Sequence, residues 1–182
     1  MYKYQNLGDF SQVNPAFLNF SSKMSWVLWY LVSIFYFNTP IPGSLVRILL
    51  LRLFGAKIGR NCLIKPLVKV KHPWLLRMGD NSWLGEGVII DNIFPVVIGS
   101  STCISQHVYI CSGNHNFRSP SFEYIKQFIT VHGQCWVCAS AIIAPGSSIN
   151  RCTVVGIGST VKGNLLPYSI YSGNPLRLYG PR

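Results

Sequence analysis

An aliphatic residue recurs at every sixth position along most of this chain, with polar and small residues in between. A period of six fits neither the 3.6-residue repeat of a helix nor the two-residue alternation of a single strand. It is typical of a solenoid in which each unit is a short strand and a tight turn, and three units close one triangular coil. The repeated positions are Ile58, Ile64, Val70, Met78, Leu84, Ile90, Ile98, Ile104, Ile110, Val131, Val137, Ile143, Ile149, Val155 and Val161.

Interruptions of the period predict where the coils have corners. Two extra residues follow Val70 and Ile90, and the period lapses over 116–130. An insertion at one corner of a solenoid would project from the body as an arm. A small or β-branched residue is common four positions after each repeated aliphatic residue. Glycine often comes directly after it, and we expect these glycines to provide positive φ at the corners. They are Gly59, Gly79, Gly85, Gly99 and Gly156.

The residues before the repeat predict two helices. Residues 24–37 are apolar almost all round, and a second apolar run covers 45–54. The expected capping residues are Ser21 or Ser22 for the first helix, Ser44 for the second, and Gly55 at the second helix's C-terminal end.

Two roles are open for residues 24–54. The first apolar run has about fourteen residues, fewer than the ~20 that cross a bilayer. We favour a helical cap on the open end of the solenoid. The alternative is a peripheral helix lying in a membrane surface, aided by Trp26, Trp29 and the excess of positive charge.

The chain divides accordingly into an N-terminal helical segment, 1–57, a parallel β-helix, 58–166, with a loop insertion at 116–130, and a C-terminal tail, 167–182. A hydrophobic content of 49% and a charged content of 12% exclude a disordered protein. The net charge of +11 favours polyanionic partners. Because the basic residues are scattered, with no basic arm or tail, we expect no nucleic-acid partner.

Six cysteines and no recognisable secretory signal predict free thiols in a cytoplasmic protein, peripheral at the inner membrane face if the helices bind lipid. Cys135 and Cys138 form a lone C-x-x-C without a second ligand pair, so we expect no metal. These cysteines fill positions that small residues occupy elsewhere in the repeat.

His115 is the residue with the strongest catalytic signal. It ends the sequence Cys-Ser-Gly-Asn-His, where the repeat lapses and the arm begins. A histidine there would be held by a rigid coil and face a cleft, as a general base requires. His72, His107 and His132 lack this context, and we interpret them as structural.

The chain resembles the left-handed parallel β-helix acyltransferases with hexapeptide repeats. It looks most like acetyltransferases assigned to colanic-acid (exopolysaccharide) biosynthesis, and is similar, more distantly, to galactoside and maltose O-acetyltransferases. The sequences that carry the resemblance are LLLRLFGAKIG (49–59), HPWLLRMGDNSWLGEG (72–87), SGNHNFRSPSF (112–122), WVCASAIIAPGSSI (136–149), VVGIGSTVKG (154–163) and YSGNPLRL (171–178).

The resemblance implies an O-acetyltransferase that moves an acetyl group from acetyl-CoA to a hydroxyl of a sugar or polysaccharide precursor. His115 would be the base, with no covalent intermediate and no metal cofactor. The enzyme would be a homotrimer that binds CoA between subunits. The CoA-binding positions that it implies are Trp136, Ala139, Ile157, Lys162 and Arg177.

Three departures from the family pattern bear on activity. Asn116 stands where the family often has Asp, Lys162 is shifted by one position, and Ile157 and Cys138 replace smaller residues. For the acceptor, the candidates are Asp91, Asn92 and Asn114, with a corner-turn cap as the alternative for the first two.

Two other functions remain open on the same fold. One is a non-catalytic scaffold. The other is a metal enzyme like the γ-type carbonic anhydrases, for which the only candidate ligands are His107, His115 and His132.

Overall fold

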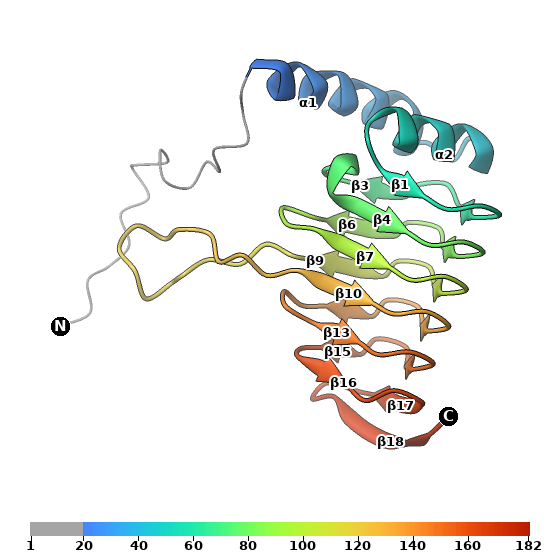
Figure 1. Cartoon of the computed structure of the whole chain (residues 1–182), viewed down its shortest axis with the longest axis vertical. Coiled ribbons are helices and arrows are strands. Elements are labelled where there is room, and N and C mark those ends of the chain that lie inside the picture. The colour runs from blue at the N-terminus through green and yellow to red at the C-terminus, as the bar shows by residue number, and fades with distance from the viewer. Residues whose placement is uncertain (1–19) are drawn as a thin grey trace.

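The computed structural model describes residues 20–182 and shows a parallel β-helix with a helical segment at one end, as the sequence predicted. Short strands stack into three parallel sheets, one on each side of a triangular coil (Figure 1). The coils wind in the left-handed sense that the resemblance implied. We name the corners AB, BC and CA after the sheets that they join in chain order.

Sheet A contains β1 (Lys57–Ile58), β4 (Leu76–Met78), β7 (Val96–Ile98), β10 (Ile129–Val131), β13 (Ser148–Ile149) and β16 (Asn164–Leu165). Sheet B contains β2 (Leu63–Ile64), β5 (Trp83–Leu84), β8 (Cys103–Ile104), β11 (Trp136–Val137), β14 (Val154–Val155), β17 (Ser169–Ser172) and the antiparallel β18 (Arg177–Pro181). Sheet C contains β3 (Lys69–Val70), β6 (Ile89–Asp91), β9 (Tyr109–Cys111), β12 (Ile142–Ile143) and β15 (Thr160–Val161).

The six-residue period is the period of the core. Each repeated aliphatic residue is buried, and equivalent residues of successive coils lie in register, as Ile110 does with Ile90 and Ile143. Burying one such side chain contributes about 1.5–3 kcal/mol relative to leaving it exposed. Because each coil covers only its neighbours, the sheets hold together as one stack.

The glycines after the repeated residues have a different role from the one predicted. Gly79 is not in the left-handed region, but a Cβ at this position would lie 2.6 Å from the backbone nitrogen of Ser100 in the next coil. Positive φ falls instead three residues after the repeat position, at Asn61, Asn81 and Ser101 (52°, 57° and 56°). The expectation was therefore wrong for these glycines, which instead allow coils to approach closely. Other corner glycines do have positive φ, at Gly87, Gly146 and Gly158 (66°, 77° and 64°).

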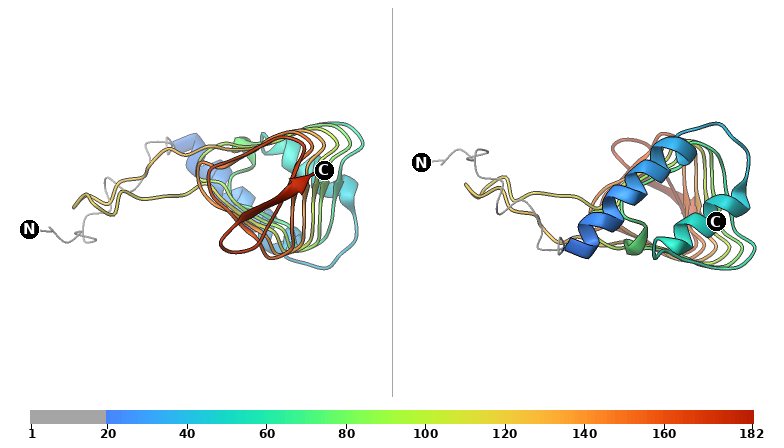
Figure 2. Two further views of the ribbon diagram at one scale, coloured as in Figure 1. Left: turned by 90° about the horizontal axis from the view of Figure 1, so that it is seen from below. Right: turned by 90° about the horizontal axis from the view of Figure 1, so that it is seen from above.

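The irregular insertions all open at corner CA. After β3 the extra residues form the 3₁₀ helix η2 (Pro73–Leu75), and after β6 they are residues 92–95. After β9 the chain leaves the body as an arm, residues 112–128, and returns to β10. Figure 1 and Figure 2 show the arm projecting well beyond the triangular body.

The N-terminal helices cover the first coil. They are α1 (Phe20–Val32), the π-helical turn η1 (Ser33–Phe37) and α2 (Ser44–Leu53). Figure 2 shows α1 and α2 lying across the end of the triangle. Trp29, Phe37 and Leu51 are buried against the core, and the Trp29 indole donates a hydrogen bond to the carbonyl of Val70 at 2.8 Å. These contacts are those of a cap on the open end.

Ser44 does not cap its own helix. It is the first residue of α2, and its hydroxyl accepts a hydrogen bond from the backbone N–H of Ile64 at 2.9 Å. No coil lies above β2 to satisfy that N–H, so the hydroxyl takes this place. The predicted cap was wrong for this reason.

The other two capping predictions have different outcomes. Helix α1 already includes Ser21 and Ser22, so neither precedes it as a cap, and their side chains lie outside the described part of the structure. Gly55 does end α2, with φ of 89° and its N–H bonded to the carbonyl of Arg52 at 2.9 Å.

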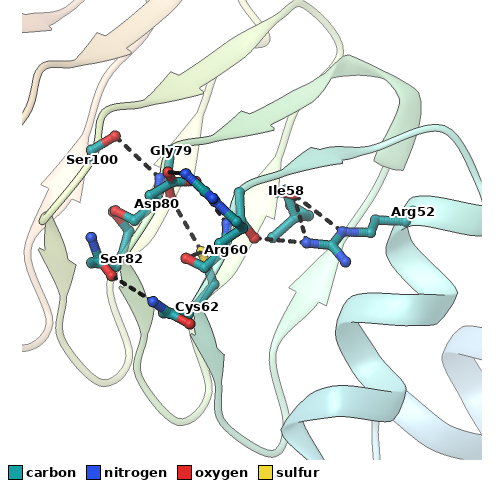
Figure 3. A network of polar contacts seen from close by, with 11 residues as sticks. Arg52, Ile58, Arg60, Cys62, Gly79, Asp80, Ser82 and Ser100 are labelled. Atoms are coloured by element: carbon teal, nitrogen blue, oxygen red, sulfur yellow. Dashed lines mark hydrogen bonds and ion pairs between the residues drawn. The ribbon is translucent and has the colours of Figure 1, made fainter.

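Arg52 ties α2 to the edge of the first coil (Figure 3). Its guanidinium donates two hydrogen bonds to the carbonyl of Ile58, at 2.9 and 3.1 Å, and one to that of Gly59 at 2.7 Å. In the following coils the same corner continues with the backbone N–H of Asp80 donating to the Ser100 hydroxyl at 3.1 Å. The helix thus supplies donors to carbonyls that sit at the start of the stack.

Candidate active site

His115 lies at the root of the arm, at corner CA of the third coil. The two chains of the arm pair there in antiparallel fashion, through a bridge between His115 and Tyr124. The N–H of Asn116 donates to the carbonyl of Glu123, and the N–H of Ile125 donates to that of Asn114, both at 2.9 Å. This short ladder fixes the backbone on both sides of the histidine.

The imidazole of His115 is held between two aromatic rings. It stacks on Phe122 at a centroid distance of 4.2 Å and an interplanar angle of 6°, and meets the Tyr124 ring at 4.1 Å. Its Nδ1 lies 2.7 Å from the carbonyl oxygen of Phe122. A carbonyl can only accept, so Nδ1 carries the proton and Nε2 presents a lone pair.

Phe122 adopts an uncommon backbone conformation to make this contact. Its φ is 47°, in the left-handed region that bulky residues rarely occupy. Outliers of this kind cluster at functional sites, where the surroundings hold them. The turn aims the Phe122 carbonyl at the His115 ring.

A carboxylate clasp closes the root of the arm. Glu123 accepts a hydrogen bond from the Asn116 side chain at 2.7 Å and another from the Ser121 hydroxyl. These bonds, with Ser121 contributing most, lower the pKa of Glu123 to about 2. Asn116, the departure noted in the sequence, therefore acts here as the donor to an ionised carboxylate.

Asn114 uses its amide to fix the arm rather than leaving it free. Its Oδ1 accepts from the backbone N–H of His115 at 2.9 Å, and its Nδ2 donates to Gln127 at 2.7 Å. The two bonds join the outgoing and returning chains of the arm next to the histidine.

Asp91 lies at corner CA one coil above the arm, in register with Cys111. It forms an ion pair with Lys71 at 2.9 Å and accepts a hydrogen bond from the Tyr109 hydroxyl at 3.2 Å. Burial, more than this contact, raises the pKa of Tyr109. Asp91 and Tyr109 line a cavity of ≈ 320 Å³ between sheet C and η1.

Asn92 is fully buried, and its contacts are those of a turn cap. Its Oδ1 accepts from the backbone N–H of His72 at 2.9 Å, and its Nδ2 donates to the His72 carbonyl at 2.7 Å. These bonds match the structural alternative for this residue, so we leave Asn92 out of the proposed site. Burial is the main cause that lowers the pKa of His72.

The positions implied for CoA lie on other parts of the coil. Trp136 stands on the outer face of sheet B, 48% exposed, with its indole donating to the Ser105 hydroxyl at 3.0 Å. Ala139 and Ile157 follow β11 and β14, at corner BC. The carbonyl of Ala139 accepts from the N–H of Gly158 at 2.9 Å, and the Ile157 side chain is exposed.

The two basic residues of the expected CoA site are both exposed. Lys162 follows β15 at corner CA, two coils below His115, and Arg177 begins β18 at the end of sheet B. Within residues 20–182 neither forms an ion pair, so each is free to meet a phosphate.

A single chain therefore brings together only part of the expected site. His115, Asn114, Asp91 and Lys162 share corner CA, whereas the other expected CoA positions lie on sheet B or corner BC. Most of the expected CoA positions thus lie on a different side of the triangular coil from His115.

The metal-enzyme alternative has no support in this arrangement. His107, His115 and His132 lie at corners BC, CA and AB respectively, so they do not converge within one chain. Among residues 20–182 no group of three His, Cys, Asp or Glu side chains is placed to hold a metal ion. All six cysteines are free thiols, and burial raises the pKa of both Cys135 and Cys138.

Several residues of the site were missed in the sequence. The root of the arm and the His115 ring are fixed from the returning chain by Phe122, Glu123 and Tyr124. The only signal for this in the sequence was the grouping of two aromatic residues and one acidic residue at these positions. Trp83 lies apart from this group, on sheet B two coils above Trp136, where it lines a cavity of ≈ 510 Å³.

Comparison with known proteins gives relatives that share this architecture. The chain is 40% identical over 129 residues to the Escherichia coli protein named "Putative colanic acid biosynthesis acetyltransferase WcaF", which covers 71% of each chain. It is 24% identical over 146 residues to the galactoside O-acetyltransferase of Escherichia coli, covering 78% of this chain and 72% of that protein.

Solved structures show the same fold. The hexapeptide-repeat acetyltransferase VCA0836 of Vibrio cholerae, complexed with acetyl-CoA, superposes with a TM-score of 0.79 at 18% identity, covering 90% of each chain. No protein-family model matches the chain. The match to the colanic-acid protein is high in identity and spans more than two thirds of both proteins, and it agrees with the repeat and the fold. The chain belongs to the hexapeptide-repeat acetyltransferases.

Proposed function

We propose that this protein transfers the acetyl group of acetyl-CoA to a hydroxyl of a sugar or polysaccharide precursor, with His115 as general base. The observation that carries the proposal is the 2.7 Å contact between His115 Nδ1 and the Phe122 carbonyl, which leaves Nε2 as an acceptor. The base is held in one tautomer and one ring orientation before substrate arrives.

The reaction needs one base and two bound substrates. Nε2 of His115 takes the proton of the acceptor hydroxyl as its oxygen attacks the thioester carbon. The tetrahedral intermediate then collapses, the carbon–sulfur bond breaks, and the imidazolium returns its proton to the departing CoA thiolate. No covalent enzyme intermediate forms, because both substrates react while bound side by side.

Acetyl-CoA binds along sheet B in this proposal. Trp136 offers an exposed aromatic face to the pantetheine arm, and Ala139 and Ile157 border it at corner BC. Arg177, at the end of sheet B, meets the phosphates of the nucleotide, and Lys162, which shares corner CA with His115, meets them from the neighbouring subunit. Both are exposed cations without ion-pair partners among the described residues. His115 comes from the neighbouring subunit of a homotrimer, since one chain does not place the two parts together.

The acceptor lies at corner CA. Asp91 is the residue that we assign to a sugar hydroxyl, because it lines an open cavity one coil above His115 and already accepts from the Tyr109 hydroxyl. Asn114 acts as a positioning residue for His115 through its bonds to the His115 N–H and Gln127.

The proposal is tested by incubating the purified protein with acetyl-CoA and a panel of sugar nucleotides, oligosaccharides and small alcohols. Thiol release is measured, and the product is identified by mass spectrometry. We expect release that depends on one class of sugar acceptor and an acetyl ester in the product. No turnover with any acceptor, together with no calorimetric binding of CoA, would instead support the non-catalytic scaffold.

Cys111 provides a test of direct transfer. It is the cysteine that lies closest in sequence to His115, and it is in register with Asp91. If transfer is direct, Cys111→Ser retains activity, and labelled acetyl-CoA without acceptor leaves no label on the protein. Loss of activity in Cys111→Ser with labelled wild-type protein would show an acyl-cysteine pathway.

A further inference from the structure

The outward surface of the N-terminal helices is apolar, although the helices already cap the core. We call it the cap face. Of the twenty-six large hydrophobic side chains exposed in the described structure, thirteen fall between residues 24 and 53. They are Met24, Trp26, Val27, Leu28, Tyr30, Leu31, Ile34, Phe35, Ile41, Leu45, Val46, Leu49 and Leu53. A concentration of this kind marks an interaction surface rather than scattered exposure.

Helix α2 is apolar on two sides. Ile48 and Leu51 are buried against the first coil, while Leu45, Leu49 and Leu53 are 76%, 61% and 79% exposed. These three leucines are four residues apart, so they form one stripe along the helix. A surface helix normally has one apolar side, which faces the core, so a second apolar side indicates a further contact.

Helix α1 repeats this arrangement with aromatic residues. Trp29 is buried and bonded to the Val70 carbonyl, whereas Trp26 and Tyr30 are exposed and stack on each other at 5.7 Å. Tryptophan and tyrosine are the residues enriched where protein meets the headgroup region of a bilayer.

The charge around the cap face is mostly positive, because the first two coils carry six exposed Lys and Arg residues against three acidic ones, Asp80, Glu86 and Asp91. None of the five acidic residues lies between residues 20 and 79, a range that holds nine of the sixteen Lys and Arg residues. Six exposed cations surround the first two coils, directly beneath the helices, and two of them form ion pairs. They are Lys57, Arg60, Lys65, Lys69, Lys71 and Arg77. A second copy of this end would bring like charges together, whereas anionic lipid complements them.

We propose that the cap face docks on an anionic membrane surface, with α1 and α2 lying in the headgroup region and the coils standing away from it. Among residues 20–182 no helix is long and apolar enough to cross a membrane. The contact is therefore peripheral, through apolar side chains on one side of each helix and basic residues beneath.

Docking sets the height of the arm above the lipid. His115 lies where the arm leaves the third coil, and the third coil is two strand spacings of about 4.8 Å below the first. With a helix of about 10 Å above the first coil, the histidine lies roughly 20 Å below the outer side of the helices, and so about 10 Å below the headgroup region that holds them. An acceptor sugar carried on a lipid would then reach corner CA; this consequence rests on the proposed function, whereas the docking does not.

The test is flotation of the full-length protein with vesicles. Vesicles of phosphatidylcholine alone are compared with vesicles that also contain phosphatidylglycerol, each at about 0.1 M and at about 1 M NaCl. The variant is Leu49→Ser with Leu53→Ser. Its matched control is Leu166→Ser with Leu178→Ser, two exposed leucines at the opposite end of the β-helix. Circular dichroism checks that all proteins are folded.

We expect the wild-type protein and the control to float with anionic vesicles, less so at high salt, and the cap variant to partition at least about tenfold less. Equal flotation of the cap variant, or no flotation of the wild type with any vesicle, would overturn the proposal. A third outcome would also overturn it. If the wild-type protein binds no vesicle but forms an oligomer in solution that the cap substitutions dissociate, then a second copy of the chain covers the cap face.

Discussion

The Nδ1 atom of His115 lies 2.7 Å from the carbonyl oxygen of Phe122, while the rings of the two residues stack at 4.2 Å. Phe122 thus fixes both the ring nitrogen of His115 that carries the proton and the plane of the imidazole. Because the hydrogen-bond acceptor is a backbone carbonyl, no side-chain substitution of Phe122 removes it. The left-handed backbone conformation at Phe122 directs this carbonyl toward the imidazole. The proposed base depends on the conformation of the arm's root more than on any one neighbouring side chain.

The clasp at Glu123 should matter for turnover more than for acetyl-CoA affinity. Glu123→Gln removes the ionised acceptor that Asn116 and Ser121 bind, so the root of the arm loosens. We expect kcat to fall about tenfold, as for a displaced positioning group, with the KM for acetyl-CoA unchanged. Steady-state kinetics measures this, and Glu86→Gln at corner BC is the matched control. An equal effect of both substitutions would argue against the clasp.

The pH dependence of the clasp follows from the lowered pKa of Glu123. Because the folded pKa, about 2, is below the ordinary value of 4.5, the carboxylate supports the arm at every pH above that ordinary value and loses this role as pH falls toward 2. The activity profile between about pH 5 and 9 should therefore contain no step from Glu123. A wild-type step above pH 5 that is absent in Glu123→Gln would contradict this.

Two adjacent isoleucines separate core packing from surface exposure. Ile143 is fully buried in the β-helix, whereas Ile142 on the same strand is 42% exposed on sheet C. We expect Ile143→Ala to lower the free energy of unfolding by about 2–5 kcal/mol and Ile142→Ala by less than about 1 kcal/mol. Denaturant unfolding measures both, and similar losses would mean that sheet C is covered in solution.

A shared site can be tested by mixing two inactive variants. His115→Ala lacks the base, and Trp136→Ala lacks the aromatic face expected to bind the pantetheine, yet each retains what the other has lost. If the site takes His115 from one subunit and Trp136 from the next, random co-assembly restores about one quarter of the sites. Co-expression with two purification tags and a thiol-release assay measures the recovery. Activity no higher than that of the separate variants would place both residues in one chain's site.

The fold was predictable because the residues that repeat every six positions are the residues that form the core. Every repeated aliphatic residue from Ile58 to Val161 is buried, and the insertions fall where the period breaks. The corner chemistry was less accessible. The glycines stand where the next coil approaches, and Ser44 bonds to a strand twenty residues later, and neither contact is encoded in local sequence.

The sequence predicted where the candidate site lies, but not which residues surround His115 there. His115 stood out because it follows a rigid coil and precedes the arm. Its partners lie on the returning side of the arm, and their contact depends on the turn at Phe122, which no periodicity describes. Asn92 shows the opposite case: a polar residue at the right corner whose amide bonds to the His72 backbone.

The most direct test of the central claim is acceptor-dependent thiol release from acetyl-CoA by His115→Ala beside the wild-type protein, with the acetyl-CoA affinity of both measured by calorimetry. The account predicts a loss of about 10²–10⁴-fold in kcat with the affinity unchanged, because only the proton transfer is removed. Wild-type turnover in His115→Ala, at equal acetyl-CoA affinity, would contradict the assignment of His115 as the base.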